Sequence, residues 1–152
     1  MHTREARRRP HPRYHVSMEP ASIWQILAAG VASVLVGMIW YHPRVFGTAW
    51  TRLAQVTPEM AARSKRRMPV YALIGLAAAM VIAWVMSTIG IALGIYDWIG
   101  AIFELALFTW LGFVVPTMLN AVLWEYRPLK LYFINIAYWF VSLSVIALIL
   151  LF

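Results

Sequence analysis

The sequence has no cysteine and little charge. None of its 152 residues is Cys, and only 12% are Asp, Glu, Lys or Arg, which is about half the share found in soluble domains. The absence of cysteine excludes disulfide scaffolds, thiolate metal sites and cysteine nucleophiles. The shortage of charge excludes a water-soluble globule, because too few polar residues are present to cover its surface.

The residues that are present are mostly apolar. Hydrophobic residues make up 62% of the chain, and the mean hydropathy is +0.72. Disordered chains have low hydrophobicity, so the composition fits only a protein that crosses a membrane several times. The net charge of +7 comes from basic residues beside apolar runs. We therefore attribute it to membrane topology and lipid contact, with no nucleic-acid partner.

Four apolar runs have the length of about 20 residues that a spanning helix needs. They cover residues 22–41, 70–94, 98–123 and 131–152. The sequence predicts an all-α polytopic membrane protein, a four-helix bundle that forms one domain over residues 22–152. A basic tail, residues 1–21, precedes it; Met18, followed by Glu19 and Pro20, is an alternative native start.

The distribution of Lys and Arg predicts the orientation. The loops 42–69 and 124–130 hold eight of these residues, whereas the loop between the second and third runs and the C-terminus hold none. By the positive-inside rule both loops are expected in the cytoplasm and both termini outside. The five arginines of the tail oppose this orientation, and the inverted protein is the alternative.

The first loop is predicted to contain a short amphipathic helix, because apolar residues from Val45 to Val56 recur at helical spacing. A second helix start follows at Thr57-Pro58-Glu59. The basic residues of this loop are either contacts for anionic lipid or a partner, or ordinary positive-inside anchors: Arg44, Arg52, Arg63, Lys65, Arg66 and Arg67.

Small residues at four-residue spacing predict close helix packing, which membrane helices use in place of hydrophobic association. In the first and second spans these residues are Ala29, Ser33 and Gly37, and Gly75, Ala79, Ala83 and Ser87. The two stripes are expected to face each other, or one of them to face another subunit.

Polar residues inside the third and fourth spans supply the other candidates. Asn120 and Asn135 fall at similar depth in a helical hairpin, about 6 Å from its turn, so we expect a hydrogen bond between them or through a shared water. Pro116 removes one helix hydrogen bond and crowds the carbonyl of Gly112, so a kink is expected between Gly112 and Pro116.

Glu104 is the one acidic residue well inside a span, and Asp97 precedes it by seven residues on the same face. An intramembrane carboxyl is by default a candidate for function, here the binding of a proton or cation. The alternative is a neutral, structural Glu or one near enough to the interface to reach water. All four histidines lie outside the spans, and no metal cluster or nucleophile–base pair is present, so no metal, cofactor or enzyme activity is predicted.

The segment that ends the first span resembles a known family. Its motif is Trp40-Tyr41, then Pro43, then Phe46-Gly47 and Trp50, with His42 where a small polar residue is expected. The chain resembles the bacterial membrane family called domain of unknown function 1761 over residues 22–150; Gly112, Pro116, Trp124, Asn135 and Tyr138 also match. The resemblance implies four spans in a bacterial inner membrane and carries no activity.

Two functions are therefore expected to compete. The first is a non-catalytic accessory subunit that packs against a larger membrane complex, with a respiratory or photosynthetic complex as a conceivable host, and with lipids and other subunits as partners. The second is a small homo-oligomeric transporter or channel that uses Glu104 and Asp97. An enzyme that acts on lipids ranks below both.

Overall fold

The computed structural model describes residues 20–95 and 99–151, and all regular structure in them is helical. Four helices are long and apolar enough to cross a membrane, so the prediction of an all-α polytopic protein is confirmed. The elements are α1 (Ile23–Trp40), the π-helical turn η1 (Pro43–Gly47), α2 (Thr48–Leu53), α3 (Pro58–Leu93), α4 (Ile99–Thr109), the π-helical segment η2 (Trp110–Val114), α5 (Val115–Leu123) and α6 (Leu129–Leu150).

Local sequence explains where α1 and α3 begin and end. Ser22 caps α1 by accepting a hydrogen bond from the Gln25 amide, and the Gln25 side chain accepts one from the Ser22 amide, which forms a capping box. Thr57 caps α3, and Pro58 occupies its first position, where a missing N–H costs nothing. Gly94 ends α3 in the left-handed conformation, at φ 65°.

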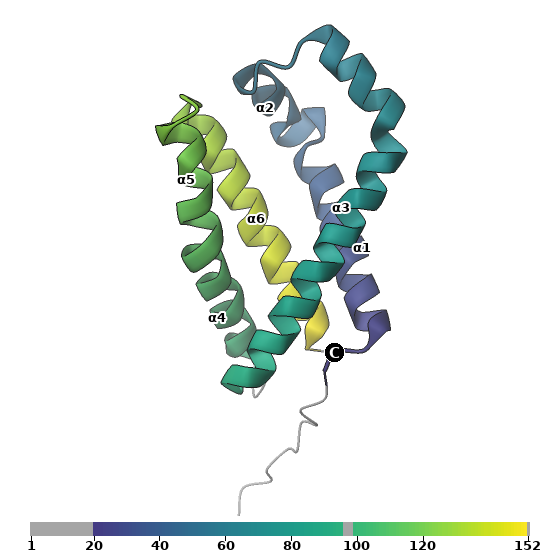
Figure 1. The fold of residues 1–152 in the computed structure, drawn as a ribbon, viewed down its shortest axis with the longest axis vertical. Helices are drawn as coiled ribbons and strands as arrows, with labels where there is room; N and C mark the ends of the chain where they lie inside the picture. The colour runs from purple at the N-terminus through teal and green to yellow at the C-terminus, as the bar shows by residue number, and fades with distance from the viewer. Residues whose placement is uncertain (1–19, 96–98, 152) are drawn as a thin grey trace, which may run out of the picture.

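The second span is longer than its sequence predicts. The expected separate helix start at Thr57 and the span from residue 70 form one continuous helix, α3, of 36 residues. No glycine lies between residues 58 and 74, so Pro69 is the only interruption, and it removes a single helix hydrogen bond. Figure 1 shows α3 curving away from the other helices over its first half.

The third span is not a regular α-helix throughout. The helix changes from α to π geometry at Trp110–Val114 and returns to α geometry at Val115. Pro116 follows directly, and the wider π turn accommodates its missing hydrogen bond. This π-helical segment overlaps the stretch from Gly112 to Pro116, and the kink expected there stays a prediction.

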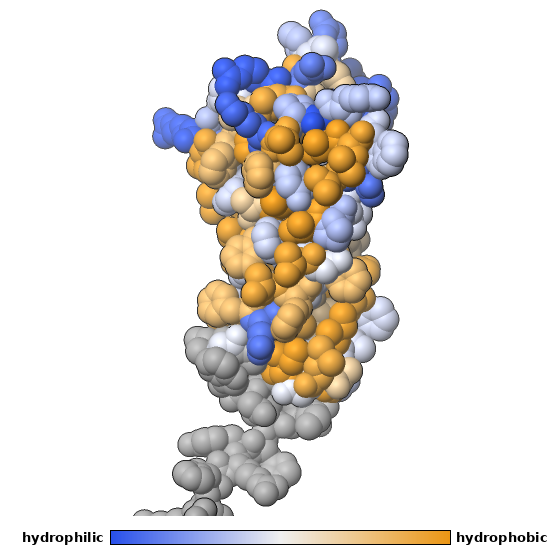
Figure 2. Space-filling view, turned by 90° about the vertical axis from the view of Figure 1, so that its left-hand side faces the viewer, coloured by the Kyte–Doolittle hydropathy of each residue, from blue (hydrophilic) through white to orange (hydrophobic). Residues whose placement is uncertain are grey.

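Helix α6 is central to the bundle, since it packs against α1, α3, α4, η2 and α5. The apolar core lies toward the end where α3 finishes and α1 begins. It includes Ile26, Met86, Leu105, Leu143 and Ile146. Figure 2 shows hydrophobic residues over most of the displayed face and hydrophilic residues gathered at the opposite end of the molecule, where α2 lies.

Candidate functional site

The chain makes a tight turn directly after α1. His42 caps η1, and its Nδ1 accepts a hydrogen bond from the Arg44 amide at 3.2 Å. Gly47 ends the turn so close to the preceding backbone that a Cβ there would collide with the carbonyl of Tyr41 and lie 2.8 Å from the carbonyl carbon of His42. Only glycine fits this position without a backbone shift, so Gly47 is required by the turn itself.

This turn brings two donors to one acceptor on α6. The hydroxyl of Tyr41 donates to Oδ1 of Asn135 at 3.2 Å, and the indole N–H of Trp50 donates to the same oxygen at 3.1 Å. The indole N–H of Trp40 donates to the backbone carbonyl of Ile134 at 3.2 Å. Three aromatic residues from the end of α1 and from α2 are therefore tied to one turn of α6.

Ring contacts surround these hydrogen bonds. The rings of Trp40 and Phe46 lie 4.6 Å apart, and those of Tyr41 and Trp50 meet edge to face at 5.5 Å. Tyr138 of α6 lies 5.2 Å from the Tyr41 ring. Such pairs add to the energy of burial. We call this group the aromatic cluster, and its members are Trp40, Tyr41, Phe46, Trp50, Asn135 and Tyr138.

The aromatic cluster gathers most of the motif that was recognised in the sequence. Four of its members belong to the stretch from Trp40 to Trp50, while Pro43 and Gly47 shape the turn that carries them. The motif had been noted as a pattern without a role. Its partner, Asn135, could have been found from the requirement that buried Tyr and Trp polar groups reach an acceptor.

The expected pairing of the two asparagines is not formed directly. Asn135 uses its carbonyl oxygen for Tyr41 and Trp50, whereas Asn120 is exposed. Within the described part of the chain no hydrogen bond joins them, so the prediction of a direct bond is wrong. The two asparagines are expected at one depth of the hairpin, but the turn after α1 brings the donors of Tyr41 and Trp50 to Asn135 instead. A bond through a shared water stays a prediction.

The small-residue stripes pack differently from the expectation. Ala29, Ala79 and Ala83 are buried, and Ala83 shares the core cluster with Ala29. Ser33, however, bonds the hydroxyl of Ser142 on α6 at 2.7 Å. Helix α1 packs against both α3 and α6, so the α1 stripe is divided between two neighbours.

The remaining small residues complete this picture. A Cβ on Gly37 would lie 3.3 Å from the hydroxyl of Tyr138 on α6, whereas the α1 glycine that meets α3 is Gly30, beside Met80. Ser87 accepts a hydrogen bond from the Ala21 amide at 3.1 Å. Gly75 meets nothing within 4 Å. The first half of α3 therefore leaves its small residue open.

The candidate carboxyls are only partly described. Asp97 lies outside the described residues. Glu104 lies on α4 and is exposed, beside the exposed side chains of Phe103 and Phe108. It lines neither the cavity against α2 nor a smaller one between α5 and α6. Glu104 therefore lies on the surface of the single chain.

The basic residues gather at the end of the bundle that holds the aromatic cluster. Figure 2 shows hydrophilic residues at this end on the displayed face. Arg127, in the turn between α5 and α6, and Lys130, in the first turn of α6, also lie at this end. The basic residues of the first loop are all exposed, and they are Arg44, Arg52, Arg63, Lys65, Arg66 and Arg67. Among the described residues the one ion pair is that of Arg127 with Glu125, at 3.9 Å and exposed.

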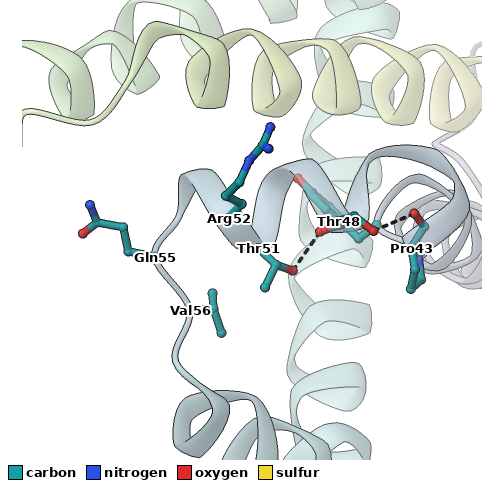
Figure 3. Close-up of a pocket in the computed structure, with 8 residues that line it drawn as sticks. Pro43, Thr48, Thr51, Arg52, Gln55 and Val56 are labelled. Carbon is teal, nitrogen blue, oxygen red and sulfur yellow. Dashed lines mark hydrogen bonds between the residues drawn. The ribbon is translucent and has the colours of Figure 1, made fainter.

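An open cavity of about 420 Å³ lies against α2 at this end, and we call it the α2 cavity. Figure 3 shows Thr51 and Val56 on one side of α2, with Arg52 extending from the other side and Gln55 at the helix end. Its lining residues are Tyr41, Pro43, Gly47, Thr48, Thr51, Arg52, Gln55 and Val56.

Hydrogen bonds fix the threonines of the α2 cavity. The hydroxyl of Thr48 donates to the carbonyl of Pro43 at 2.9 Å, and that of Thr51 donates to the carbonyl of Gly47 at 2.7 Å (Figure 3). Each hydroxyl has used its one proton and keeps a lone pair for a further donor. The cavity therefore holds fixed acceptors, while Arg52, which also lines it, extends its unpaired guanidinium from the other side of α2.

A metal centre has no counterpart in the described residues, where no group of three His, Asp or Glu residues lies close enough to hold an ion. In the aromatic cluster, Tyr41 and Trp50 donate to Asn135, and Trp40 donates to the backbone carbonyl of Ile134. The aromatic cluster therefore has a structural role, because it connects α1, α2 and α6. The exposed basic residues and the exposed first half of α3 are the surfaces that other molecules can reach.

Comparison with known proteins gives a family and no activity. No curated protein and no solved structure matches the chain. A family model described as "Protein of unknown function (DUF1761)" matches residues 24–151. Apart from Ile23, this range contains all four spanning helices, and it includes the turn after α1 and the aromatic cluster. The chain therefore belongs to the DUF1761 family of proteins of unknown function.

Proposed function

We propose that the protein is a non-catalytic membrane subunit that docks another membrane polypeptide against the first half of α3. The observation that carries the proposal is the exposure of this half-helix. Every residue from Thr57 to Gly75 is exposed, although residues from Val70 onward are almost all apolar. Leu73 is 68% exposed and Ile74 is 60% exposed.

The second half of α3, in contrast, has residues that are packed against the other helices. Ala79, Ala83 and Met86 are at most 5% exposed. Lipid tails give helices no hydrophobic reason to associate, and close approach at small residues takes that role. Gly75 supplies an open small residue on the first half, because a side chain there would meet nothing within 4 Å.

The neighbouring part of α1 extends this docking face. Leu35, Met38 and Ile39 of α1 are each more than half exposed, and the curve of α3 away from α1 leaves both helices open (Figure 1). A transmembrane helix of a partner that lies here would contact α1 and α3 together. A respiratory or photosynthetic complex of a bacterial inner membrane is a conceivable host, with the loops 42–69 and 124–130 in the cytoplasm.

The competing proposal is a homo-oligomeric transporter that uses Glu104. The exposure of Glu104 on α4 supports it only if copies of the chain meet at α4, because this residue lies on the surface of the single chain. The α3 face and the α4 face belong to different sides of the bundle (Figure 1). The two proposals therefore differ in the face through which the protein assembles.

The experiment extracts the natively expressed protein in mild detergent, measures its native mass and identifies each polypeptide that migrates with it. Gly75→Leu fills the α3 face without touching the chain's own packing, and Gly112→Leu is the matched control, since its position is also open within 4 Å. We expect Gly75→Leu alone to release the partner.

Three outcomes would contradict the proposal. These are a monomer in the native extract, a homo-oligomer without other polypeptides, and equal assembly of the Gly75→Leu and Gly112→Leu proteins. A homo-oligomer that is lost in a Glu104→Gln variant would favour the transporter instead.

A further inference from the structure

The α2 cavity lies beside the docking face and has no part in the proposed docking. We infer that it binds the headgroup of an anionic membrane phospholipid, specifically a headgroup that carries hydroxyl groups next to its phosphate. The inference rests on three properties of the cavity: its charge, the hydrogen-bonding state of its threonines and its level in the bundle.

Charge selects an anion. Eight Lys and Arg residues of the described chain lie at this end, with only Glu59 and Glu125 as carboxylates. Arg52 lines the cavity, is exposed, and forms no ion pair or hydrogen bond among the described residues. In Figure 3 its guanidinium extends from the side of α2 opposite Thr51 and Val56. Because it has no partner there, it is free to turn toward a phosphate and bind it by paired hydrogen bonds. Gln55, which also lines the cavity, adds a neutral amide donor.

The threonines select the rest of the headgroup. Thr48 and Thr51 have already given their protons to the carbonyls of Pro43 and Gly47. They can only accept from a ligand, and the phosphodiester of a phospholipid carries no proton at neutral pH, so it offers them no donor. A glycerol hydroxyl does, so a phosphoglycerol headgroup satisfies both the arginine and the threonines.

The level of the cavity favours a lipid over a soluble anion. Tyr41 and Pro43 line it, and they follow directly on Trp40, the last residue of the spanning helix α1. Tyr and Trp residues mark the headgroup level of membrane proteins, and the aromatic cluster lies at this level. The volume of about 420 Å³ lies within the usual range of ligand sites, about 300–1,000 Å³.

The test uses native mass spectrometry of the full chain in mild detergent. The probes are phosphatidylglycerol, phosphatidylcholine and the water-soluble glycerophosphoglycerol. The variants are Arg52→Gln, Thr51→Val and the control Arg66→Gln, an exposed arginine outside the cavity. Arg52 and Arg66 are both exposed, so neither change disturbs packing, and helix content by circular dichroism verifies this.

We expect phosphatidylglycerol to bind more tightly than phosphatidylcholine. Loss of one charge-assisted contact in Arg52→Gln is expected to weaken the affinity for phosphatidylglycerol about tenfold. Arg66→Gln is expected to change this affinity less than about twofold. Thr51→Val is expected to reduce the preference for phosphatidylglycerol over phosphatidylcholine. Equal weakening by Arg52→Gln and Arg66→Gln would overturn the site in favour of diffuse attraction. Equal binding of both lipids would contradict selection of the glycerol headgroup. Full competition by glycerophosphoglycerol would show that the cavity binds a soluble anion as well as it binds a lipid.

Discussion

The carboxamide of Asn135 joins parts of the chain that are far apart in sequence. Its oxygen accepts hydrogen bonds from Tyr41 and Trp50, so Asn135→Leu leaves two donors without an acceptor. Membrane hydrogen bonds average about 0.6 kcal/mol each, and we expect a loss of about 1–2 kcal/mol in the free energy of unfolding. Denaturant titration of the purified protein measures it.

Asn120→Leu is the control for this change, because Asn120 is exposed and has no hydrogen bond in the described chain. We expect it to leave the unfolding midpoint unaltered. Equal destabilisation by the two substitutions would show that Asn120 also has a structural partner, such as the shared water first expected for the pair.

A second residue-scale prediction concerns glycine. Gly47→Ala places a Cβ against the carbonyl of Tyr41, and forced overpacking costs about 1–3 kcal/mol. Gly75→Ala meets nothing within 4 Å and removes a helix-interior glycine, which favours folding by about 0.5–1 kcal/mol. The two substitutions should therefore move the thermal unfolding midpoint in opposite directions, and a stable Gly47→Ala protein would refute the geometry of η1.

Between elements, the contact of α1 with α6 depends on small buried side chains. Ser33 is 3% exposed and lies 2.7 Å, oxygen to oxygen, from Ser142. Ser33→Ala should cost less than about 1 kcal/mol, because the Ser142 hydroxyl can return to a carbonyl of its own helix. Ser33→Leu should cost about 1–3 kcal/mol, since its added volume separates α1 from α6.

Val31→Leu, at a position that is 42% exposed, is the control for the added volume. Unfolding in detergent, followed by tryptophan fluorescence, distinguishes the three proteins. If Ser33→Leu unfolds at the midpoint of Val31→Leu, then α1 does not pack on α6 through Ser33.

The same comparison of elements shows what the sequence can predict. Apolar runs marked the four spans to within about two residues at most ends, because hydropathy and helix length have one solution in a bilayer. The start of the second spanning helix was not predicted: the apolar run begins at residue 70, whereas α3 begins at Pro58 and continues through Pro69. Hydropathy marks only the part of a helix that lies in the membrane, whereas the helix extends as far as its backbone hydrogen bonds.

The candidate site was predicted in its residues but not in its contacts. The motif from Trp40 to Trp50 was recognised, yet its link to Asn135 depends on the π-helical turn at Pro43–Gly47, whose geometry no residue spacing encodes. Ser142 was missed because one serine within an apolar helix gives no periodic signal. Pairings across helices depend on their rotation about the axis, which the apolar composition of all four spans leaves undefined.

At the scale of the whole molecule, packing and polarity are divided between the two ends. The apolar core lies at the end where α3 finishes, and the aromatic cluster lies at the end with all eight described Lys and Arg residues. This arrangement agrees with the loop pattern from which the cytoplasmic side was inferred. Because all of these basic residues lie at one end, the orientation is defined by which side of the membrane that end faces.

The absence of cysteine allows this orientation to be read directly, since a single introduced thiol is unambiguous. Lys65→Cys and Lys130→Cys report the basic end, and Ala92→Cys, exposed near the end of α3, reports the other. In intact cells an impermeant maleimide should label Ala92→Cys alone, and in inside-out vesicles only the two lysine positions. The reverse pattern would place the basic end outside, against the positive-inside rule, and would leave the α2 cavity facing outer-leaflet lipid. Labelling of Lys65→Cys and Lys130→Cys from opposite sides would contradict the four-span topology, because an even number of crossings must separate those two positions.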